Sequence, residues 1–273
     1  MNIYYINLDA AAERRNNIER NLAACAHGTR YQRIPAFDAE YVNVNQISGS
    51  MRPGVKACFL SHIEAIETSL ESEEPSLILE DDAILGARTI EILNEILPTI
   101  NGVDILFTDV CAPNIHSMLQ LFKLRNSLAD SVRVFDIRQI HFAGSSGYIL
   151  PNNESKKKVL AILKSFESID VPYDLVLRDL INDGRLTSSA CFPFLTSLTP
   201  GAAMSQIQLE EDKLPNVVYD TFRKLMFFES ERVHPDLLKE VECVPEEFYD
   251  RNSTIFTAIL RLLLSRNFPF EAL

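Results

Sequence analysis

Three consecutive carboxylates, Glu80, Asp81 and Asp82, are the residues of this sequence best suited to chemistry. They follow an apolar run at 77–79, which predicts a buried strand that ends at the cluster. Negative charges this close repel one another unless a cation or hydrogen-bond donors offset them. Magnesium and manganese ions prefer oxygen ligands, so the cluster predicts a divalent-metal site open to a substrate phosphate. A solvated acidic turn that opens a helix is the alternative that the residues alone leave open.

Other polar residues have weaker signals. Ser61 and His62 are expected to open a helix, where a histidine is more often a cap neighbour or a buried, satisfied ring than a catalyst. Arg14 and Arg15 have the chemistry to bind phosphate, although paired arginines on a polar helix face are usually solvated. The lysine run at 156–158 is interpreted as a solvated helix face.

Several classes of protein are excluded by missing motifs. No Gly-x-Gly-x-x-Gly follows the first predicted strand and no P-loop is present, which argues against Rossmann dehydrogenases and P-loop NTPases. The cluster Gly144-Ser-Ser-Gly147 lacks the glycine spacing of a nucleophile elbow, so a serine hydrolase is disfavoured. We expect its glycines to permit a tight turn or the close approach of a ligand.

Composition and charge narrow the choice further. The 273 residues suit one large domain or one domain with an appendage. With 26 basic and 38 acidic residues, the formal charge of -12 repels phosphate backbones and disfavours nucleic acid as a partner. The five cysteines form no CxxC pair and are interpreted as reduced thiols. The N-terminal residues do not resemble a signal peptide and no stretch is long and apolar enough to span a membrane, so a cytoplasmic location is predicted.

Strand and helix patterns alternate along the first two thirds of the chain. Strands are predicted at 3–8, 76–80, 104–108, 132–137 and 147–150, and helices follow the first strand, begin near Ser61, and cover 154–166. This alternation predicts an α/β domain whose ligands collect beyond the carboxyl ends of its strands. From about residue 205 the strand signals fade, and helices are predicted at 216–231, 236–241 and 253–266, separated by Pro215, Pro235 and Pro245.

Several of these stretches occur together in one order, and in that order the chain resembles glycosyltransferase family 25. The resemblance covers about residues 1 to 200 and rests on 3–9 with Arg14 and Arg15, 33–38, 54–62, 77–82, 144–148 and 172–174. It implies a GT-A-like fold, a Rossmann-type nucleotide-sugar-binding domain with a mixed central sheet, carrying a C-terminal helical appendage. The expected division is a catalytic domain at 1–204 and a helical segment at 205–273.

The resemblance also implies an activity. Family members include lipopolysaccharide and lipooligosaccharide glycosyltransferases, many of them galactosyltransferases, and the related collagen galactosyltransferases. The expected reaction is a metal-dependent, inverting transfer of a hexose, galactose from UDP-galactose, onto a glycan acceptor such as lipopolysaccharide. By this likeness Glu80 and Asp82 correspond to a DxD-like motif that holds Mn²⁺, or Mg²⁺, against the donor diphosphate. Residues implied to bind the donor are Asn7, Asp9, Arg15, Ser61, His62 and Asp81.

An inverting transfer needs a base that takes the proton of the acceptor hydroxyl. Asp174 matches the family's Pro-x-Asp pattern and is the first choice, with Asp109 second; for Asp174 a helix N-cap is an equally weighted alternative. Two positions depart from the family pattern, Ala10 after the first-strand aspartate and Val55 ahead of Cys58. These departures leave a second hypothesis, a diverged relative that binds sugar nucleotides without transferring the sugar. A third hypothesis is a metal-dependent phosphohydrolase that uses the same acidic cluster.

The apolar stripes of the helical segment must be buried somewhere. Packing on the catalytic domain is the default expectation, and dimerisation or peripheral contact with the inner face of the membrane is the alternative.

Overall fold

The computed structural model describes residues 1–128, 130–138, 140–199, 210–234, 236–242 and 251–265, with the backbone alone at 210–215 and 251. Pro235, Cys243, Pro245 and residue 266, which figure in the sequence predictions, lie outside these residues. Cys25, Cys58, Cys111 and Cys191 are free thiols. Within the described part of the chain, no helix combines the length and apolar character needed to cross a membrane.

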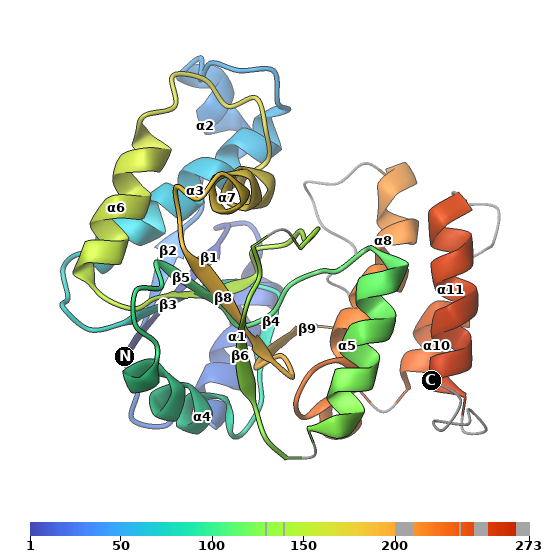
Figure 1. Ribbon diagram of the computed structural model, residues 1–273. Coiled ribbons are helices and arrows are strands. Elements are labelled where there is room, and N and C mark those ends of the chain that lie inside the picture. The colour runs from blue at the N-terminus through green and yellow to red at the C-terminus, as the bar shows by residue number, and fades with distance from the viewer. Residues whose placement is uncertain (129, 139, 200–209, 235, 243–250, 266–273) are drawn as a thin grey trace.

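A seven-stranded mixed sheet forms the centre of the molecule (Figure 1). In spatial order its strands are β2 (Tyr31–Pro35), β1 (Asn2–Asn7), β3 (Ser76–Glu80), β7 (Gly147–Leu150), β5 (Ile105–Phe107), β8 (Ser188–Phe192) and β6 (Arg133–Asp136). β1 runs parallel to β2 and β3, and β5 runs parallel to β8. β7 is antiparallel to both β3 and β5, and β6 is antiparallel to β8. A small sheet pairs β4 (Ala83–Leu85) with β9 (Thr196–Leu198).

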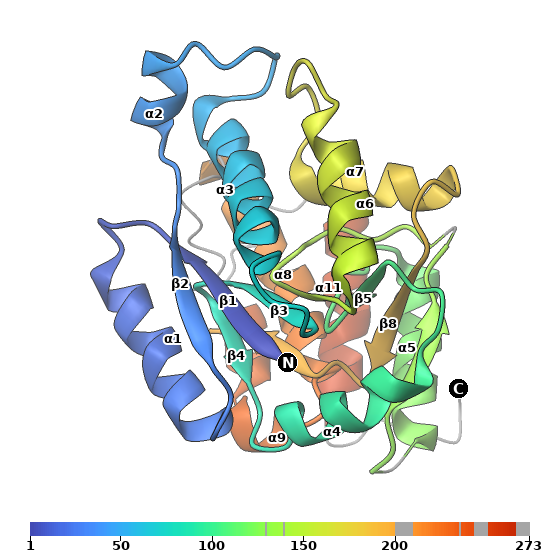
Figure 2. The same ribbon diagram turned by 90° about the vertical axis from the view of Figure 1, so that its left-hand side faces the viewer.

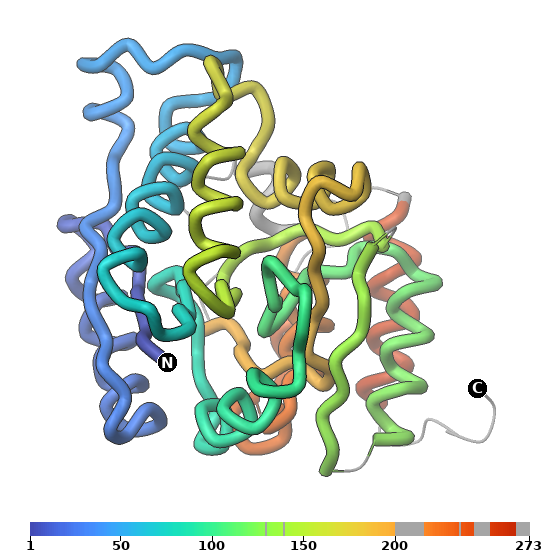
Figure 3. The backbone as a smooth tube through the Cα atoms, turned by 60° about the vertical axis from the view of Figure 1, so that its left-hand side comes forward, coloured from blue at the N-terminus to red at the C-terminus, as the bar shows by residue number. Residues whose placement is uncertain are grey.

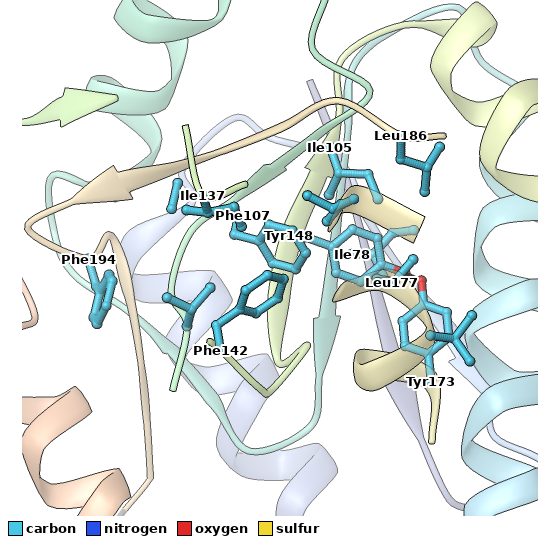
Figure 4. Packing of buried hydrophobic residues seen from close by; sticks show 14 of the residues in the cluster. Ile78, Ile105, Phe107, Ile137, Phe142, Tyr148, Tyr173, Leu177, Leu186 and Phe194 are labelled. Atoms are coloured by element: carbon cyan, nitrogen blue, oxygen red, sulfur yellow. Dashed lines mark hydrogen bonds between the residues drawn. The ribbon is translucent and has the colours of Figure 1, made fainter. Parts of the chain in front are cut away.

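Helices cover both faces of this sheet because its strands are apolar on both sides (Figure 2). Tyr4 and Ile6 of β1 join a buried cluster with α3 (Pro53–Ser69), α6 (Asn153–Lys164) and α7 (Tyr173–Asn182). Ile3 and Tyr5, which point the other way, join a second cluster with α1 (Ala12–Cys25) and α4 (Thr89–Ile96). The first cluster includes the rings of Phe107, Tyr148 and Phe142 shown in Figure 4. α2 (Ala39–Val44) follows β2, and a short 3-10 turn, Leu97–Thr99, follows α4.

The remaining helices stand together at one side of the sheet, as Figures 1 and 3 show. They are α5 (Ile115–Ser127), α8 (Glu210–Leu225), α9 (Ser230–Val233), α10 (Leu237–Glu242) and α11 (Arg251–Leu264). Val218, Phe222 and Met226 of this region belong to the same buried cluster as Phe107 and Phe142. Backbone bonds add to this packing, because the Phe194 N–H donates to the Met226 carbonyl and the Phe228 N–H to the Phe194 carbonyl.

The predicted α/β fold with a mixed sheet is confirmed, and each predicted strand corresponds to a strand of the structure. Three local predictions are wrong. Ser61 and His62 do not open a helix, because α3 already begins at Pro53, a residue suited to a first helical position. Pro215 does not separate helices but lies inside α8, where it removes only one backbone donor near the N-terminal end. The same boundary error applies to the helix predicted at 216–231, which is instead α8 and α9, interrupted after Leu225.

The third wrong prediction is the solvated lysine run. Lys156 is fully buried, and its ammonium group donates to the carbonyls of Ser69, Ser72 and Glu74 at 2.7–2.9 Å. These carbonyls lie at and just after the C-terminal end of α3, where unpaired carbonyls favour a cation. Lys157 and Lys158 are exposed, as predicted, and Lys158 pairs with Asp104.

Candidate active site

A cavity of about 310 Å³ opens where β1 and β3 end, against α3. Its position agrees with the expectation that ligands collect beyond the carboxyl ends of parallel strands. The lining combines apolar side chains with a group of polar residues. The polar and charged lining residues are Asn7, Arg14, Asp38, Ser61, His62, Glu80, Asp81 and Asp82.

Glu80, the last residue of β3, is held by two neighbours. The Ser145 hydroxyl donates to Glu80 Oε1 at 3.1 Å, and His62 Nε2 lies 3.5 Å from the same oxygen. Burial raises the pKa of Glu80, but His62, Ser145 and Arg223 outweigh it and lower the pKa below its ordinary value. Glu80 is therefore a carboxylate at neutral pH.

Asp82 stands in the opposite electrostatic situation. Burial and the charge of Glu80 raise its pKa to about 8, against the attraction of Arg14. Its Oδ1 atom is buried and has no hydrogen-bond partner among the described residues. A cation bound beside Asp82 would offset the repulsion between these carboxylates and lower the pKa of Asp82.

Asp81 is tied to the first strand and the first helix. Asn7 donates to Asp81 Oδ2 at 2.7 Å, and Arg14 Nη1 lies 3.0 Å from Oδ1 and 3.9 Å from Asp82. Asn7 is itself held by Arg33, whose Nε donates to Asn7 Oδ1 at 3.1 Å. Arg14 is therefore not the simply solvated charge expected from its sequence context.

His62 lies at the back of the cavity, fully buried in α3. Its ring stacks on Tyr173 with centroids 4.0 Å apart, and Nδ1 lies 3.1 Å from the Tyr148 hydroxyl. Nε2 has no hydrogen-bond partner in the described part of the chain. The ring is thus fixed on one side and open on the side of Glu80.

The residues present fit a divalent cation. His62 Nε2 and Asp82 Oδ1 are buried polar atoms without a hydrogen-bond partner among the described residues, and both residues line the same cavity as the Glu80 carboxylate. Ligand atoms of Cys58, His62 and Glu80 also lie within 4.8 Å of one another. Carboxylate ligands suit Mn²⁺ and Mg²⁺, whereas an imidazole suits later transition metals and a thiolate favours softer ions.

Asp109 follows β5 and is completely buried. Arg223 Nη2 of α8 lies 2.6 Å from Asp109 Oδ2, and the Ser146 hydroxyl lies 3.1 and 3.2 Å from its two oxygens. Burial lowers the pKa of Arg223, but Asp109 and Asp220 raise it above its ordinary value, so the guanidinium stays charged. Asp109 is not among the residues that line the cavity.

Asp174 lies in the first turn of α7, half-buried. The Gly144 N–H donates to its Oδ2 at 2.8 Å. Its alternative role as the N-cap of this helix is wrong, because the N-cap residue is Pro172 and no side chain caps the helix.

The structure brings together on the cavity wall six of the residues proposed for metal and donor binding: Asn7, Ser61, His62, Glu80, Asp81 and Asp82. Asp9 pairs with Arg33 at the exposed end of β1, and neither Asp9 nor Arg15 is among the lining residues. Sequence reasoning missed Ser145, Arg223 and the aromatic wall formed by Phe37. The glycine-flanked serines were a sequence signal for Ser145, and the 33–38 stretch was one for Phe37. Nothing in the sequence links Arg223 to Asp109.

A cavity beyond the carboxyl ends of the strands of an α/β sheet is where ligands bind in such folds. The chain belongs to glycosyltransferase family 25, described as an LPS biosynthesis protein family, whose model matches residues 1–177. This membership confirms the resemblance found in the sequence. No curated protein matches the chain. Among solved structures, the chain is similar to the apo crystal structure of mouse xyloside xylosyltransferase 1, with 14% sequence identity, a TM-score of 0.35, and coverage of 68% of this chain and 70% of that one.

Proposed function

We propose that this glycosyltransferase carries out a metal-dependent, inverting transfer of a hexose from a UDP-sugar, with UDP-galactose as the expected donor. The proposed acceptor is a glycan such as lipopolysaccharide or lipooligosaccharide. The observation that carries the proposal is the cavity of this family member, where Glu80 lies with two buried polar atoms, His62 Nε2 and Asp82 Oδ1, that have no hydrogen-bond partner among the described residues.

Glu80 and Asp82 are the proposed metal ligands, and His62 Nε2 is a third atom free to take part. When bound, Mn²⁺ or Mg²⁺ supplies positive charge that stabilises the UDP leaving group. Asp81 is held away from this role by Asn7 and Arg14. Arg14, which is part-exposed and lies at the cavity, adds a guanidinium suited to a diphosphate oxygen.

The nucleoside is proposed to lie at the end of β1. Phe37 is half-buried on the cavity wall, and its backbone N–H donates to the Ser61 hydroxyl at 2.9 Å. An aromatic face in this position suits stacking on a uracil ring. Ser61 thereby contributes by fixing this wall, while Asp9 and Arg15 stay proposed donor contacts farther from the carboxylates.

Asp174 is the proposed general base. It is half-exposed, and one of its oxygens accepts from the Gly144 N–H, which orients the carboxylate. Asp109, the second choice, is completely buried and held by Arg223 and Ser146, so an acceptor hydroxyl reaches it less easily. We assign Asp109 a supporting place beside the site.

The setting of the reaction is also proposed. For this proposed acceptor class, the proposed location is the cytoplasm, with peripheral contact at the inner face of the membrane. The segment at 205–273 is proposed to pack on the catalytic domain at 1–204, with a homodimer as the alternative role for its exposed side chains.

The test is acceptor-dependent release of UDP by the purified chain, with and without Mn²⁺. The double variant Asp81→Asn/Asp82→Asn is compared with Glu91→Gln, which changes an exposed carboxylate on α4. We expect transfer by the wild type and by Glu91→Gln, and loss in the double variant. Full, manganese-independent transfer by the double variant would contradict the metal role, and binding of a UDP-sugar without any transfer would favour the non-catalytic relative suggested by Ala10 and Val55.

A further inference from the structure

The loop Gly144–Gly147 contacts both of the functional carboxylates named above. The Gly144 N–H donates to Asp174 Oδ2 at 2.8 Å, and the Ser145 hydroxyl donates to Glu80 Oε1 at 3.1 Å. The Glu80 N–H in turn donates to the Ser146 carbonyl at 2.9 Å. Any displacement of this loop therefore moves the proposed metal ligand and the proposed base together.

Arg223 of α8 holds this loop from behind. Its Nη2 atom donates to the Ser146 hydroxyl and lies 2.6 Å from Asp109 Oδ2. It also packs against Gly144, whose φ is +85°, so closely that an added Cβ there would lie 3.3 Å from Nη1. The side chain is 6% exposed and is not part of the cavity wall. Apart from the attraction between its charge and Glu80, Arg223 therefore acts on the site through the loop and not by touching a ligand of the cavity.

The helix that carries Arg223 is firmly placed. Phe222 and Met226, one helical turn apart, are buried in the central cluster. The Phe194 N–H donates to the Met226 carbonyl at 3.0 Å. A guanidinium on such a support keeps its planar donors in a fixed direction.

We propose that Arg223 is a positioning residue for sugar transfer, which sets the Gly144–Gly147 loop and through it the geometry of Glu80 and Asp174. Residue 223 lies beyond the part of the chain that matches the family, which ends at residue 177. The expected effect on kcat rests on the proposed function. The expected effect on the loop rests on the described contacts alone.

The test uses Arg223→Lys, which keeps the charge but lacks the planar, multiple-donor fork. Lys224→Met is the matched control, because Lys224 is the next residue of α8, is equally buried, and pairs with Glu240 away from the loop. Amide hydrogen exchange of the peptide that spans 144–147 is the first readout and needs no turnover. We expect exchange in Arg223→Lys to rise about tenfold over wild type and to exceed any rise in Lys224→Met.

The second readout is the kinetics of UDP release. In Arg223→Lys we expect kcat to fall by about 10- to 100-fold, as for residues that orient a ligand from behind, with KM for the donor changed by less than about threefold. The double variant Asp109→Asn/Arg223→Met removes both buried charges, so it leaves no unpaired buried carboxylate to destabilise the fold. It therefore separates loss of positioning from loss of stability. We expect it to unfold at a higher temperature than Arg223→Met but to keep a low kcat.

Wild-type exchange and a kcat within about twofold of wild type in Arg223→Lys would overturn the inference, as would full recovery of kcat in the double variant. If the wild type itself transfers no sugar, the proposed function fails, and the exchange arm still decides whether Arg223 sets the loop.

Discussion

The part of the chain matched by the family and the helices from α8 onward contribute opposite charges to one site. Residues 1–177 supply the carboxylates Glu80, Asp82, Asp109 and Asp174, whereas α8 supplies the buried guanidinium of Arg223. The matched part also has a cation of its own, Arg14, which is 30% exposed at the cavity, against 6% for Arg223. The comparison shows that Asp109, a buried carboxylate of the matched part, has its ion-pair partner on a helix that follows that part.

The largest effect is expected at the proposed base, which tests whether the chemistry lies in the matched part. Asp174→Asn keeps the shape of the side chain but removes its proton acceptor, so kcat should fall by about 100- to 10,000-fold. Donor affinity should stay unchanged. Asp179→Asn, an exposed carboxylate on the same helix, is the control. Comparable loss of kcat in both variants, or none in Asp174→Asn, would remove Asp174 from this role.

The next prediction concerns the packing between the two regions, measured as the free energy of unfolding. Phe222 is 1% exposed in the shared core, so Phe222→Ala should lower the free energy of unfolding by about 3–5 kcal/mol. Phe166→Ala, at a ring that is 40% exposed, should lower it by about 1 kcal/mol or less. Urea unfolding followed by circular dichroism checks both. Two separate transitions, with only the later one affected by Phe222→Ala, would mean that the regions fold independently.

A binding measurement distinguishes the role of Arg14 from that of Arg223. Arg14 has one face at the cavity, so Arg14→Met should weaken UDP binding by about tenfold through loss of a charge-assisted contact. Arg20→Met, on the same helix but fully outside the cavity, should not change it. Calorimetric titration with UDP measures the difference. Equal affinities for wild type and Arg14→Met would show that Arg14 serves Asp81 alone.

The smallest expected effect concerns acid sensitivity in the later region. Burial and Lys224 lower the pKa of His234 to about 4, and its Nε2 lies 2.7 Å from the Ser197 hydroxyl. The unfolded chain binds the proton near pH 6.5, so stability contributed by the neutral ring is present above that pH and falls as the pH drops toward 4. Between pH 7 and pH 5, wild type should lose about 2 kcal/mol more than His234→Gln.

Urea unfolding at the two pH values measures this difference, with the exposed residue His27 changed in His27→Gln as the control. If His234→Gln loses as much stability as wild type between these pH values, His234 does not carry the acid sensitivity.

The sequence predicted the fold and the cavity best where the signals are local. The apolar run before Glu80 predicted both the buried strand and the carboxylates at its end, because burial and strand polarity are determined within a few residues. Lys156 was misjudged for the opposite reason: its partners are carbonyls of Ser69, Ser72 and Glu74, distant in sequence. The predicted helix start at Ser61 is wrong because Pro53, eight residues earlier, is the first residue of α3.

Long-range pairs explain the rest of what was missed. Arg223 and Asp109 are separated by more than a hundred residues, and their contact depends on how α8 packs in the shared core. The same is true of Ser145 and Glu80, which meet because β7 lies antiparallel to β3. A residue type and its local spacing indicate what a side chain is able to do, whereas its partner is determined by topology.

The central claim, a metal-dependent UDP-sugar site in the β1–β3 cavity, is tested most directly by isothermal titration. The purified chain is titrated with UDP-galactose, UDP-glucose, UDP-GlcNAc and GDP-mannose, each with and without Mn²⁺. We predict binding of one UDP-sugar, UDP-galactose first among them, that depends on Mn²⁺ and is absent for GDP-mannose. Failure of all four to bind in the presence of Mn²⁺, or equal binding with and without it, would contradict the claim.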